Sequence, residues 1–431
     1  MREAAERDPP GEQMTNTNRW LQLTVGVLCM VMIANLQYGW TYFVDPINAK
    51  YHWGRTSIQI AFTIFVATET WLVPVEGWFV DRFGPRFVAT LGGGVVALGW
   101  TLNAYADSLW TLYAAAAITG IGGGAVYGTC VGQALKWFAD RRGLAAGLTA
   151  AGFGAGTVAT VAPIIAVIRN NGYERAFLWF GIGQGLAIVI LSQFLRAPRP
   201  GEAPKAATKV SQSTRNCLPI EMVSTPLFWI LYTMFVLVAA SGLVVTAQVA
   251  PIARDYKLAG LPVNFLFISS TVLVMAGIVD NILNGLARPA FGWVSDQIGR
   301  ENTMAIAFVA GAAAYWALGT IASSPWTFIV SAGLVYFTWG EIYSLFPALC
   351  TDLYGPKFAT TNAGLLYTAK GTAALLVPLA SWLQARTGSW HSVFVVAAVA
   401  NILVGAAALF VVKPMRQAVQ AVIPLARPSH T

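Results

Sequence analysis

The chain has 431 residues, of which 56% are hydrophobic and only 11% are charged, and its mean hydropathy is +0.59. Soluble domains carry roughly 25% charged residues, so most of this protein's exterior must meet an apolar solvent, which predicts a membrane protein. A cytosolic enzyme, a nucleic-acid binder and a disulfide-stapled secreted domain are thereby excluded. The net charge of +8 must then be explained by where the cations lie along the chain.

Apolar runs that can cross a bilayer, at about 20 residues per crossing, recur along the whole chain. The first run is too long for the core of a signal peptide and lacks its basic lead-in, so we expect it to be retained as a helix. We therefore predict an all-α membrane protein with twelve transmembrane helices. Their expected spans are 21–44, 58–80, 87–106, 109–134, 143–167, 175–196, 226–250, 264–290, 303–322, 326–350, 361–384 and 390–412.

The expected helices fall into two six-helix halves, 21–196 and 226–412, joined by a linker, 197–225, that is rich in Pro, Ala, Lys and Ser. Polar tails, 1–20 and 413–431, flank the halves. Eighteen Lys and Arg residues lie in the tails, the linker and the connections on one side of the membrane, against seven on the other side. The positive-inside rule places both tails and the linker in the cytoplasm. The positive charge is therefore a topology signal and not a nucleic-acid footprint.

A short loop motif follows the second helix of each half. It reads Gly77-x3-Asp81-Arg82-x-Gly84-x-Arg86 in the first half and Gly292-x3-Asp296-x2-Gly299-Arg300 in the second. The two aspartates are 215 residues apart, half the chain length, as a parallel six-plus-six repeat requires. The first segment resembles the signature loop of the major facilitator superfamily. This resemblance implies the major facilitator fold, with gating roles for Asp81, Arg82, Arg86, Asp296 and Arg300.

Glycines at three- and four-residue spacing occupy 120–124 and 143–156. Neither run is followed by the Lys-Ser/Thr pair of a nucleotide-binding loop, and both lie in expected membrane helices. We interpret them as positions where helix backbones approach closely.

Two cations, Arg288 and Lys370, fall inside expected membrane helices. Each costs about 2.5–3.5 kcal/mol at the bilayer centre, so both need a partner, water or a ligand. Arg288 lies about 12 Å along its helix from Asp296, and Lys370 about 15 Å beyond the turn 352–360, which puts them at similar depth. A carboxylate about 4 Å from a cation gains about 4 kcal/mol at an effective dielectric near 20. We therefore expect a small anion to bind in a cavity shared by the two halves.

Polar and aromatic residues accompany these cations. The stretches concerned are Gln37-Tyr38-x-Trp40, Asn284-Gly-Leu-Ala-Arg288-Pro, Thr338-Trp339-Gly with Tyr343-x-Leu-Phe346-Pro347, and Ala369-Lys370. They are similar to the oxalate:formate antiporter branch of the superfamily. The resemblance implies that Arg288 and Lys370 bind the two carboxylates of oxalate. It also implies a surrounding site of Gln37, Tyr38, Trp40, Tyr127, Asn284, Trp339, Tyr343 and Tyr367. Tyr367 stands where that branch has Trp, and Phe153 where it has Tyr.

Four acidic residues also fall inside expected helices: Glu69, Glu76, Asp280 and Glu341. The antiporter branch is uncharged at these positions. Asp280 lies about 12 Å along the helix from Arg288, too far for direct pairing, although it could line an outer vestibule. These carboxyls are either held neutral or hydrogen-bonded between helices, or they carry protons. Glu69 and Asp280 are the candidates for proton coupling.

We predict a secondary active transporter of small carboxylates, not an enzyme, that works by alternating access, with oxalate:formate-type anion exchange as the first hypothesis. The alternative is a proton-coupled symporter of monocarboxylates such as lactate or pyruvate. A buried lysine among aromatic rings could also hold retinal, but twelve helices and a duplicated loop favour a carrier. We expect no cofactor, metal or nucleic-acid partner, and a monomer in the bacterial inner membrane whose partners are carboxylate anions and lipid.

Overall fold

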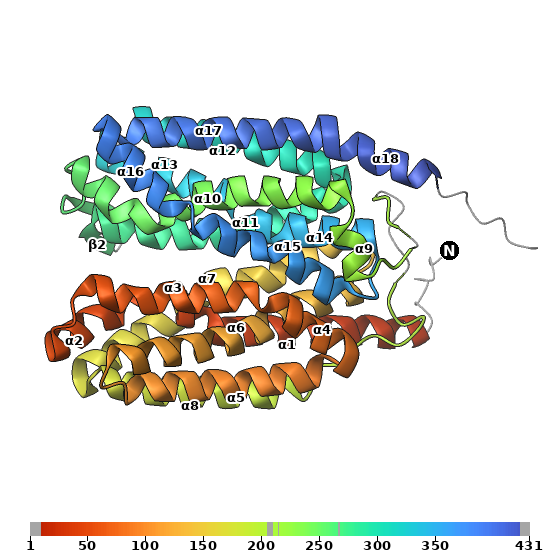
Figure 1. Cartoon of the computed structure of the whole chain (residues 1–431), viewed down its shortest axis with the longest axis horizontal. Coiled ribbons are helices and arrows are strands. Elements are labelled where there is room, and N and C mark those ends of the chain that lie inside the picture. The colour runs from red at the N-terminus through yellow and green to blue at the C-terminus, as the bar shows by residue number, and fades with distance from the viewer. Residues whose placement is uncertain (1–9, 205–209, 214, 266–267, 423–431) are drawn as a thin grey trace, which may run out of the picture.

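The computed structural model describes residues 10–204, 210–213, 215–265 and 268–422. Apart from one short hairpin these residues form helices, which run nearly parallel to the long axis of the molecule in two bundles (Figure 1). The first bundle contains the chain up to α8 and the second begins at α10. We call the end at which α1 begins and α18 lies the terminal end of the molecule.

The first half is built from helices that begin and end at helix-stopping residues. Gly84 separates α4 from α5, and Ser108 caps α6 by accepting a hydrogen bond from the backbone N–H of Thr111. The helices are α1 (Pro10–Tyr38), α2 (Thr41–Tyr51), α3 (Arg55–Trp71), α4 (Val73–Phe83), α5 (Pro85–Ala104), α6 (Leu109–Trp137), α7 (Arg142–Asn171) and α8 (Tyr173–Ser192).

The second half repeats this pattern with three additions: a short helix before its first crossing, a β-hairpin, and a helix that extends the last crossing. Two of its crossings are interrupted, between α13 and α14 and between α15 and α16. Its elements are α9 (Pro219–Val223), α10 (Pro226–Asp255), β1 (Pro262–Phe265), β2 (Ile268–Thr271), α11 (Val272–Ile298), α12 (Arg300–Thr320), α13 (Pro325–Trp339), α14 (Ile342–Tyr354), α15 (Ala359–Ala374), α16 (Val377–Thr387), α17 (Trp390–Ala407), η1 (Ala408–Val412) and α18 (Lys413–Val422).

In the described part of the chain, ten helical stretches are long and apolar enough to cross a membrane, or eleven if the bent pair α3 and α4 forms one crossing. The remaining predicted crossing corresponds to α11, whose 27 residues span about 40 Å. Asp280, Asn281, Asn284 and Arg288 lower its hydropathy. The predicted crossing that falls below the composition expected of a membrane helix is therefore the one that contains Arg288.

The predicted helix 264–290 is wrong at its start. Residues Pro262–Phe265 and Ile268–Thr271 form an antiparallel hairpin, with Phe265 opposite Ile268, and the helix begins only at Val272. Aromatic and β-branched residues favour strands, and a short apolar run does not distinguish a strand from a helix. At the other end the helix continues to Ile298, eight residues beyond the expected boundary.

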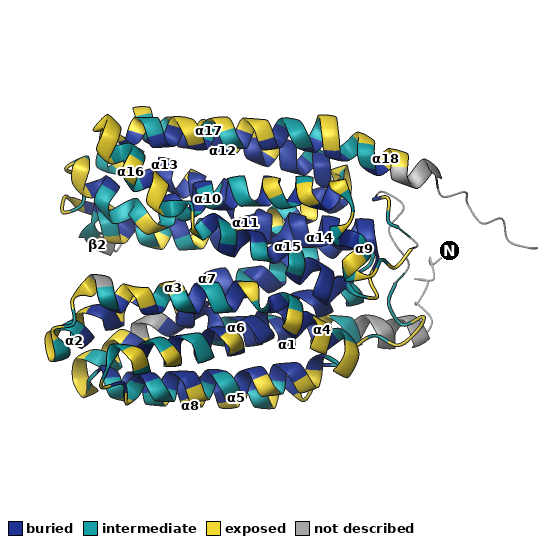
Figure 2. Cartoon of the chain, viewed as in Figure 1, coloured by how far each residue is buried: buried dark blue, intermediate teal, exposed yellow. Residues whose placement is uncertain are grey.

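The two halves meet through close helix contacts, with α7 packed along α11 and α4 along α15. Buried residues are concentrated where the bundles meet toward the terminal end, whereas the outer helices carry the exposed ones (Figure 2). A Cβ atom added at Gly147 would collide with the backbone oxygen of Arg288, and one added at Gly143 would collide with that of Gly292. The glycines of α7 thus allow the backbone of α11 to approach at the positions where the halves join.

We expect Gly147→Ala to separate α7 from α11, because its methyl group would collide with backbone and not with a movable side chain. Overpacking of this kind costs about 1–3 kcal/mol, which lowers the apparent thermal unfolding midpoint of the detergent-purified protein. The matched control is Gly94→Ala in α5, where an added Cβ has nothing within 4 Å. That variant should match or exceed the wild type, since Ala favours a helix over Gly. Equal midpoints for the two variants would contradict the role of Gly147.

Candidate functional site

Arg288 lies in α11 with 1% of its surface exposed. Its Nε and Nη2 donate to the side-chain oxygen of Asn284 at 3.0 and 2.8 Å, and its Nη1 donates to the backbone oxygen of Ala150 in α7 at 2.7 Å. The guanidinium also lies 4.6 Å from the ring centre of Tyr343. Every hydrogen-bond acceptor of Arg288 in the described structure is neutral. Its charge is therefore buried and solvated by dipoles alone.

Lys370 in α15 is equally buried but differently compensated. Its Nζ donates to Glu69 Oε2 at 3.3 Å, to Gln37 Oε1 at 3.3 Å and to the Tyr367 hydroxyl at 3.0 Å. Glu69 is 1% exposed, and its Oε1 has no hydrogen-bond partner among the described residues. Of the partner, water or ligand that the sequence requires for each cation, Lys370 has a partner, because it forms a buried ion pair with Glu69 of the other half.

Aromatic rings connect the two cations. Lys370 Nζ lies 5.9 Å from the centre of Tyr343, the same ring that Arg288 contacts, so both cations lie beside Tyr343. Tyr127 stacks on Tyr367 with ring centres 4.7 Å apart, and Trp339 meets Tyr343 edge-on at 5.6 Å. We call the whole set the cation–aromatic cluster. Its members are Gln37, Tyr38, Glu69, Tyr127, Phe153, Asn284, Arg288, Trp339, Tyr343, Tyr367 and Lys370.

Two predicted residues lie outside this cluster. Trp40 packs against Phe177 inside the first half, with ring centres 6.4 Å apart. Asp280 is 2% exposed and lies between α11 and α13, near Gly333, so it is buried and does not line an open vestibule. Neither of its carboxyl oxygens has a hydrogen-bond partner among the described residues. The same holds for Glu341, which is fully buried at the break between α13 and α14.

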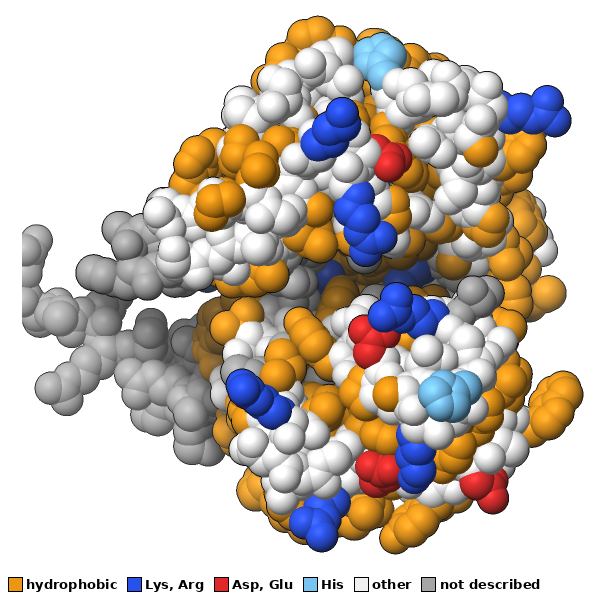
Figure 3. Space-filling model, turned by 90° about the vertical axis from the view of Figure 1, so that its left-hand side faces the viewer, with side chains coloured by type: hydrophobic (Ala, Val, Ile, Leu, Met, Phe, Trp, Pro, Cys, Tyr) orange, Lys and Arg blue, Asp and Glu red, His pale blue; other side chains and the backbone are white. Residues whose placement is uncertain are grey.

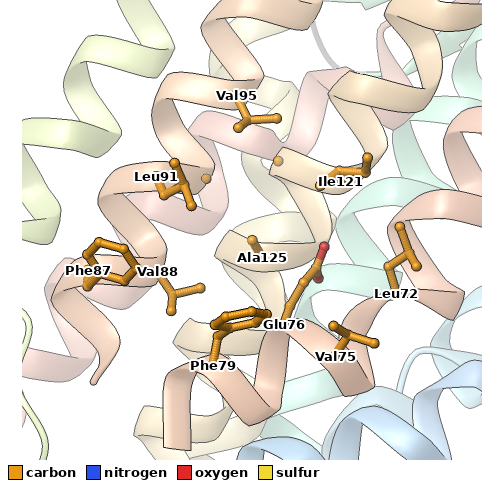
Figure 4. Close-up of a pocket in the computed structure, with 12 residues that line it drawn as sticks. Leu72, Val75, Glu76, Phe79, Phe87, Val88, Leu91, Val95, Ile121 and Ala125 are labelled. Atoms are coloured by element: carbon orange, nitrogen blue, oxygen red, sulfur yellow. The ribbon is translucent and has the colours of Figure 1, made fainter. Parts of the chain in front are cut away.

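Glu76 borders a different hollow. A cavity of about 370 Å³ lies between α4, α5 and α6 and is lined, apart from Glu76, by apolar residues and glycine. Figure 4 shows the Glu76 side chain among Phe79, Ala125 and Ile121. Several lining side chains are exposed on the outer face of the first half, so this hollow opens toward the membrane and contains neither buried cation.

A network of buried charges joins the halves at the terminal end. Asp352 of α14 accepts from Arg142 Nη1 at 2.7 Å and from Arg300 Nε at 2.9 Å. Asp296 accepts from Arg300 Nη1 at 2.5 Å and from the backbone N–H groups of Gly143 and Leu144 at 3.0 and 2.8 Å. The carboxylates of the second half thus hold the beginning of α7 from the first half.

The loop motif of the first half makes a second junction. Asp81 accepts from Lys136 Nζ at 2.6 Å, and its other oxygen accepts from the backbone N–H and hydroxyl of Thr361 in the second half at 3.0 and 2.7 Å. Arg82 and Arg86 are exposed, and Arg82 lies over the ring of Trp78 on its own helix at 5.3 Å. Asp81 therefore bridges the halves, whereas Arg82 makes a local contact.

The opposite end of the molecule is arranged differently. Figure 3 shows that end hollowed between the two halves. Ion pairs and hydrogen bonds join the halves at the terminal end, whereas the halves are separated by a hollow at the opposite end (Figure 3). The conformation is therefore closed at the terminal end. Sequence reasoning missed four residues of the contacts at the terminal end: Lys136, Arg142, Asp352 and Thr361. The basic residues of the loop 136–142 indicate the orientation of the helices in the membrane, but their spacing does not reveal these contacts.

Comparison with known proteins identifies the family. Residues 25–378 and 279–427 match the Major Facilitator Superfamily. The chain belongs to the Major Facilitator Superfamily. Its members are transporters and not enzymes, so the predicted family, all-α fold and absence of enzyme function are confirmed. A solved structure of the proton:xylose symporter XylE matches the fold with a TM-score of 0.70 at 12% identity, covering 92% of this chain and 96% of that one.

Relatives within the superfamily are more informative. The chain is 34% identical over 409 residues to the oxalate:formate antiporter of Oxalobacter formigenes, covering 95% of each protein. It is 24% identical over 337 residues to monocarboxylate transporter 12 of Mus musculus, covering 72% of this chain and 68% of the relative. This superfamily member is therefore similar to proteins named for carboxylate transport.

We expect Asp352→Asn to destabilise the junction of the halves at the terminal end, because it removes the carboxylate shared by Arg142 and Arg300. Breaking a buried ion pair costs about 3–5 kcal/mol, so the apparent unfolding midpoint of the purified protein should fall. The control is Asp45→Asn, the same chemical change in an exposed pair with Arg55, worth about 0–1 kcal/mol. A midpoint of Asp352→Asn within error of Asp45→Asn would show that this network of buried charges does not stabilise the junction of the halves.

Proposed function

We propose that this secondary transporter carries small carboxylates. The single observation on which the proposal rests is Arg288, a buried guanidinium at the junction of the halves. Its hydrogen-bond acceptors among the described residues are all neutral. Arginine presents a planar set of donors that matches a carboxylate with two parallel hydrogen bonds. A carboxylate bound there would supply the missing negative charge. The surrounding rings limit the volume, which favours a small planar anion over a sugar.

The same residues suit alternating access. Arg288 and Lys370 both belong to the second half and both bond to the first, through Ala150, Gln37 and Glu69. A ligand bound among them would contact both halves. The ion pairs and hydrogen bonds at the terminal end would break and re-form as access to the ligand changes from one side of the membrane to the other. We place the terminal end in the cytoplasm of a bacterial cell and the protein in the inner membrane, from the excess of Lys and Arg on that side.

Exchange of oxalate for formate, or of similar anions, is the first candidate mode. The named antiporter relative supports it, as does the uncompensated charge of Arg288. A buried charge without a counter-ion is costly in a low dielectric. The empty carrier therefore reorients its site across the membrane slowly, whereas the loaded carrier reorients readily. This difference favours exchange over net transport.

Proton-coupled symport of monocarboxylates is the second candidate mode, and Glu69 is the observation that favours it. Its carboxyl is buried within the half-to-half junction, where a proton could be bound and released as Lys370 changes partner. Asp280, also buried and without a hydrogen-bond partner among the described residues, is the other candidate carrier of the proton. The named monocarboxylate transporter relative is consistent with this mode.

Proteoliposomes containing the purified chain distinguish the two modes. Exchange predicts oxalate uptake only when formate or oxalate is present inside the vesicles, whereas symport predicts lactate or pyruvate uptake into empty vesicles under an inward proton gradient. A thermal-shift screen over oxalate, formate, malonate, lactate and pyruvate identifies the anions to test. If no carboxylate stabilises the protein and none is transported, the proposed function is wrong.

Substitution of Arg288 tests the site directly. Hydrogen bonds to charged groups are worth about 1.5–3 kcal/mol each, so Arg288→Ala should weaken carboxylate binding by at least about a hundredfold and abolish uptake. Arg169→Ala removes an exposed arginine that belongs neither to the cation–aromatic cluster nor to the loop motifs, and it serves as the binding control. Binding by Arg288→Ala within about threefold of the wild type would rule out the assignment, provided that the variant still unfolds cooperatively.

A further inference from the structure

The cation–aromatic cluster contains two cations and one carboxylate. Arg288, Lys370 and Glu69 are 1%, 2% and 1% exposed, so their charges are not screened by bulk water. With Glu69 ionised, the cluster carries a single excess positive charge. That charge belongs to Arg288, because Lys370 is paired with Glu69 and the acceptors of Arg288 are neutral.

The donors of the two cations are used unequally. An ammonium has three N–H donors, and Lys370 directs hydrogen bonds to three acceptors: Glu69, Gln37 and Tyr367. Arg288 directs three donors to the oxygens of Asn284 and Ala150 and also interacts with the hydroxyl of Tyr38, all of them neutral groups. A ligand carboxylate at Arg288 therefore competes only with neutral acceptors. To bind Lys370 it must displace one of that residue's partners.

We infer that Glu69 is a built-in counter-ion that makes the site selective for substrates with one negative charge. This inference rests on the proposed carboxylate site. A monocarboxylate binds Arg288 and leaves the Lys370–Glu69 pair in place, so the loaded cluster is neutral. A dicarboxylate that also engages Lys370 leaves the Glu69 carboxylate buried without a cation, unless Glu69 takes up a proton. Dicarboxylate binding is therefore coupled to the uptake of one proton, and monocarboxylate binding is not.

In the described structure Lys370 supplies the positive charge that pairs with Glu69. The titratable side chains that interact electrostatically with it come from α1, α4, α6, α14 and α15, and they are Tyr38, Glu76, Tyr127, Tyr343, Tyr367 and Lys370. Lys370 is the single cation among them, and the others are phenols and one acid. An ionised Glu69 that has lost Lys370 would consequently face no compensating charge in this set.

The first test compares Glu69→Gln with Glu76→Gln in the purified full-length chain, by titration with formate and with oxalate. Both changes replace a buried glutamate by its neutral isostere, but Glu76 makes no ion pair with Lys370. Glu69→Gln should shift the ratio of the two affinities toward oxalate by at least about tenfold, while Glu76→Gln leaves that ratio unchanged. A ratio within about twofold of the wild type in Glu69→Gln overturns the inference.

The second test uses the wild type, so it stands even if the variant does not fold. Formate and oxalate are both fully ionised between about pH 6 and 8. Oxalate affinity should fall by up to about tenfold per pH unit as the pH rises, because one proton binds with it, whereas formate affinity stays constant. Oxalate binding independent of pH overturns the role of Glu69 and leaves the carboxylate site intact. Absence of binding by formate, oxalate, lactate and pyruvate alike overturns the proposed function itself.

Discussion

Burial of positive charge in a low-dielectric interior is the constraint on which the centre of this protein depends. Two cations lie where the halves meet, and the chain compensates them by different means. Lys370 is paired with a carboxylate from the first half, whereas Arg288 is surrounded by an amide oxygen, a backbone oxygen and an aromatic ring. Because dipoles offset a full charge only in part, Arg288 keeps an attraction for anions that Lys370 has already satisfied. The chemistry of the site is thus asymmetric.

That asymmetry is linked to the packing of the helices. The backbone oxygen of Ala150 in α7 accepts a hydrogen bond from Arg288. This contact is possible because Gly147 and Gly154 have no side chains that would keep α7 away from α11. On the other side, a Cβ added at Gly371 would lie 2.5 Å from the hydroxyl of Thr70, so α15 approaches α3 closely beside the pair of Lys370 and Glu69. Glycines at the half-to-half junction therefore position the charges as well as the helices.

The sequence contains the features that follow from short-range patterns. Hydropathy predicts the crossings, the repeated loop motif predicts the two halves, and charge inside an apolar run draws attention to Arg288 and Lys370. Pairing across the halves is beyond such patterns. Glu69 and Lys370 are 301 residues apart, and the rotation of α3 against α15 depends on packing that no local periodicity records. For the same reason Asp352 could not be matched with Arg142, although each lies at the end of a helix where such contacts are common.

The carboxylate of Glu69 also affects how much net charge anion exchange would move across the membrane. If the site keeps one excess positive charge, it is neutralised equally by a monocarboxylate or by a dicarboxylate that enters with a proton on Glu69. Each loaded form then crosses the membrane with the same net charge, so exchange of one for the other moves no net charge and is insensitive to membrane potential. A site with two uncompensated cations would instead carry different charges in the two directions. Under the proposed exchange, the pair between Glu69 and Lys370 would thus determine whether transport is electroneutral or electrogenic.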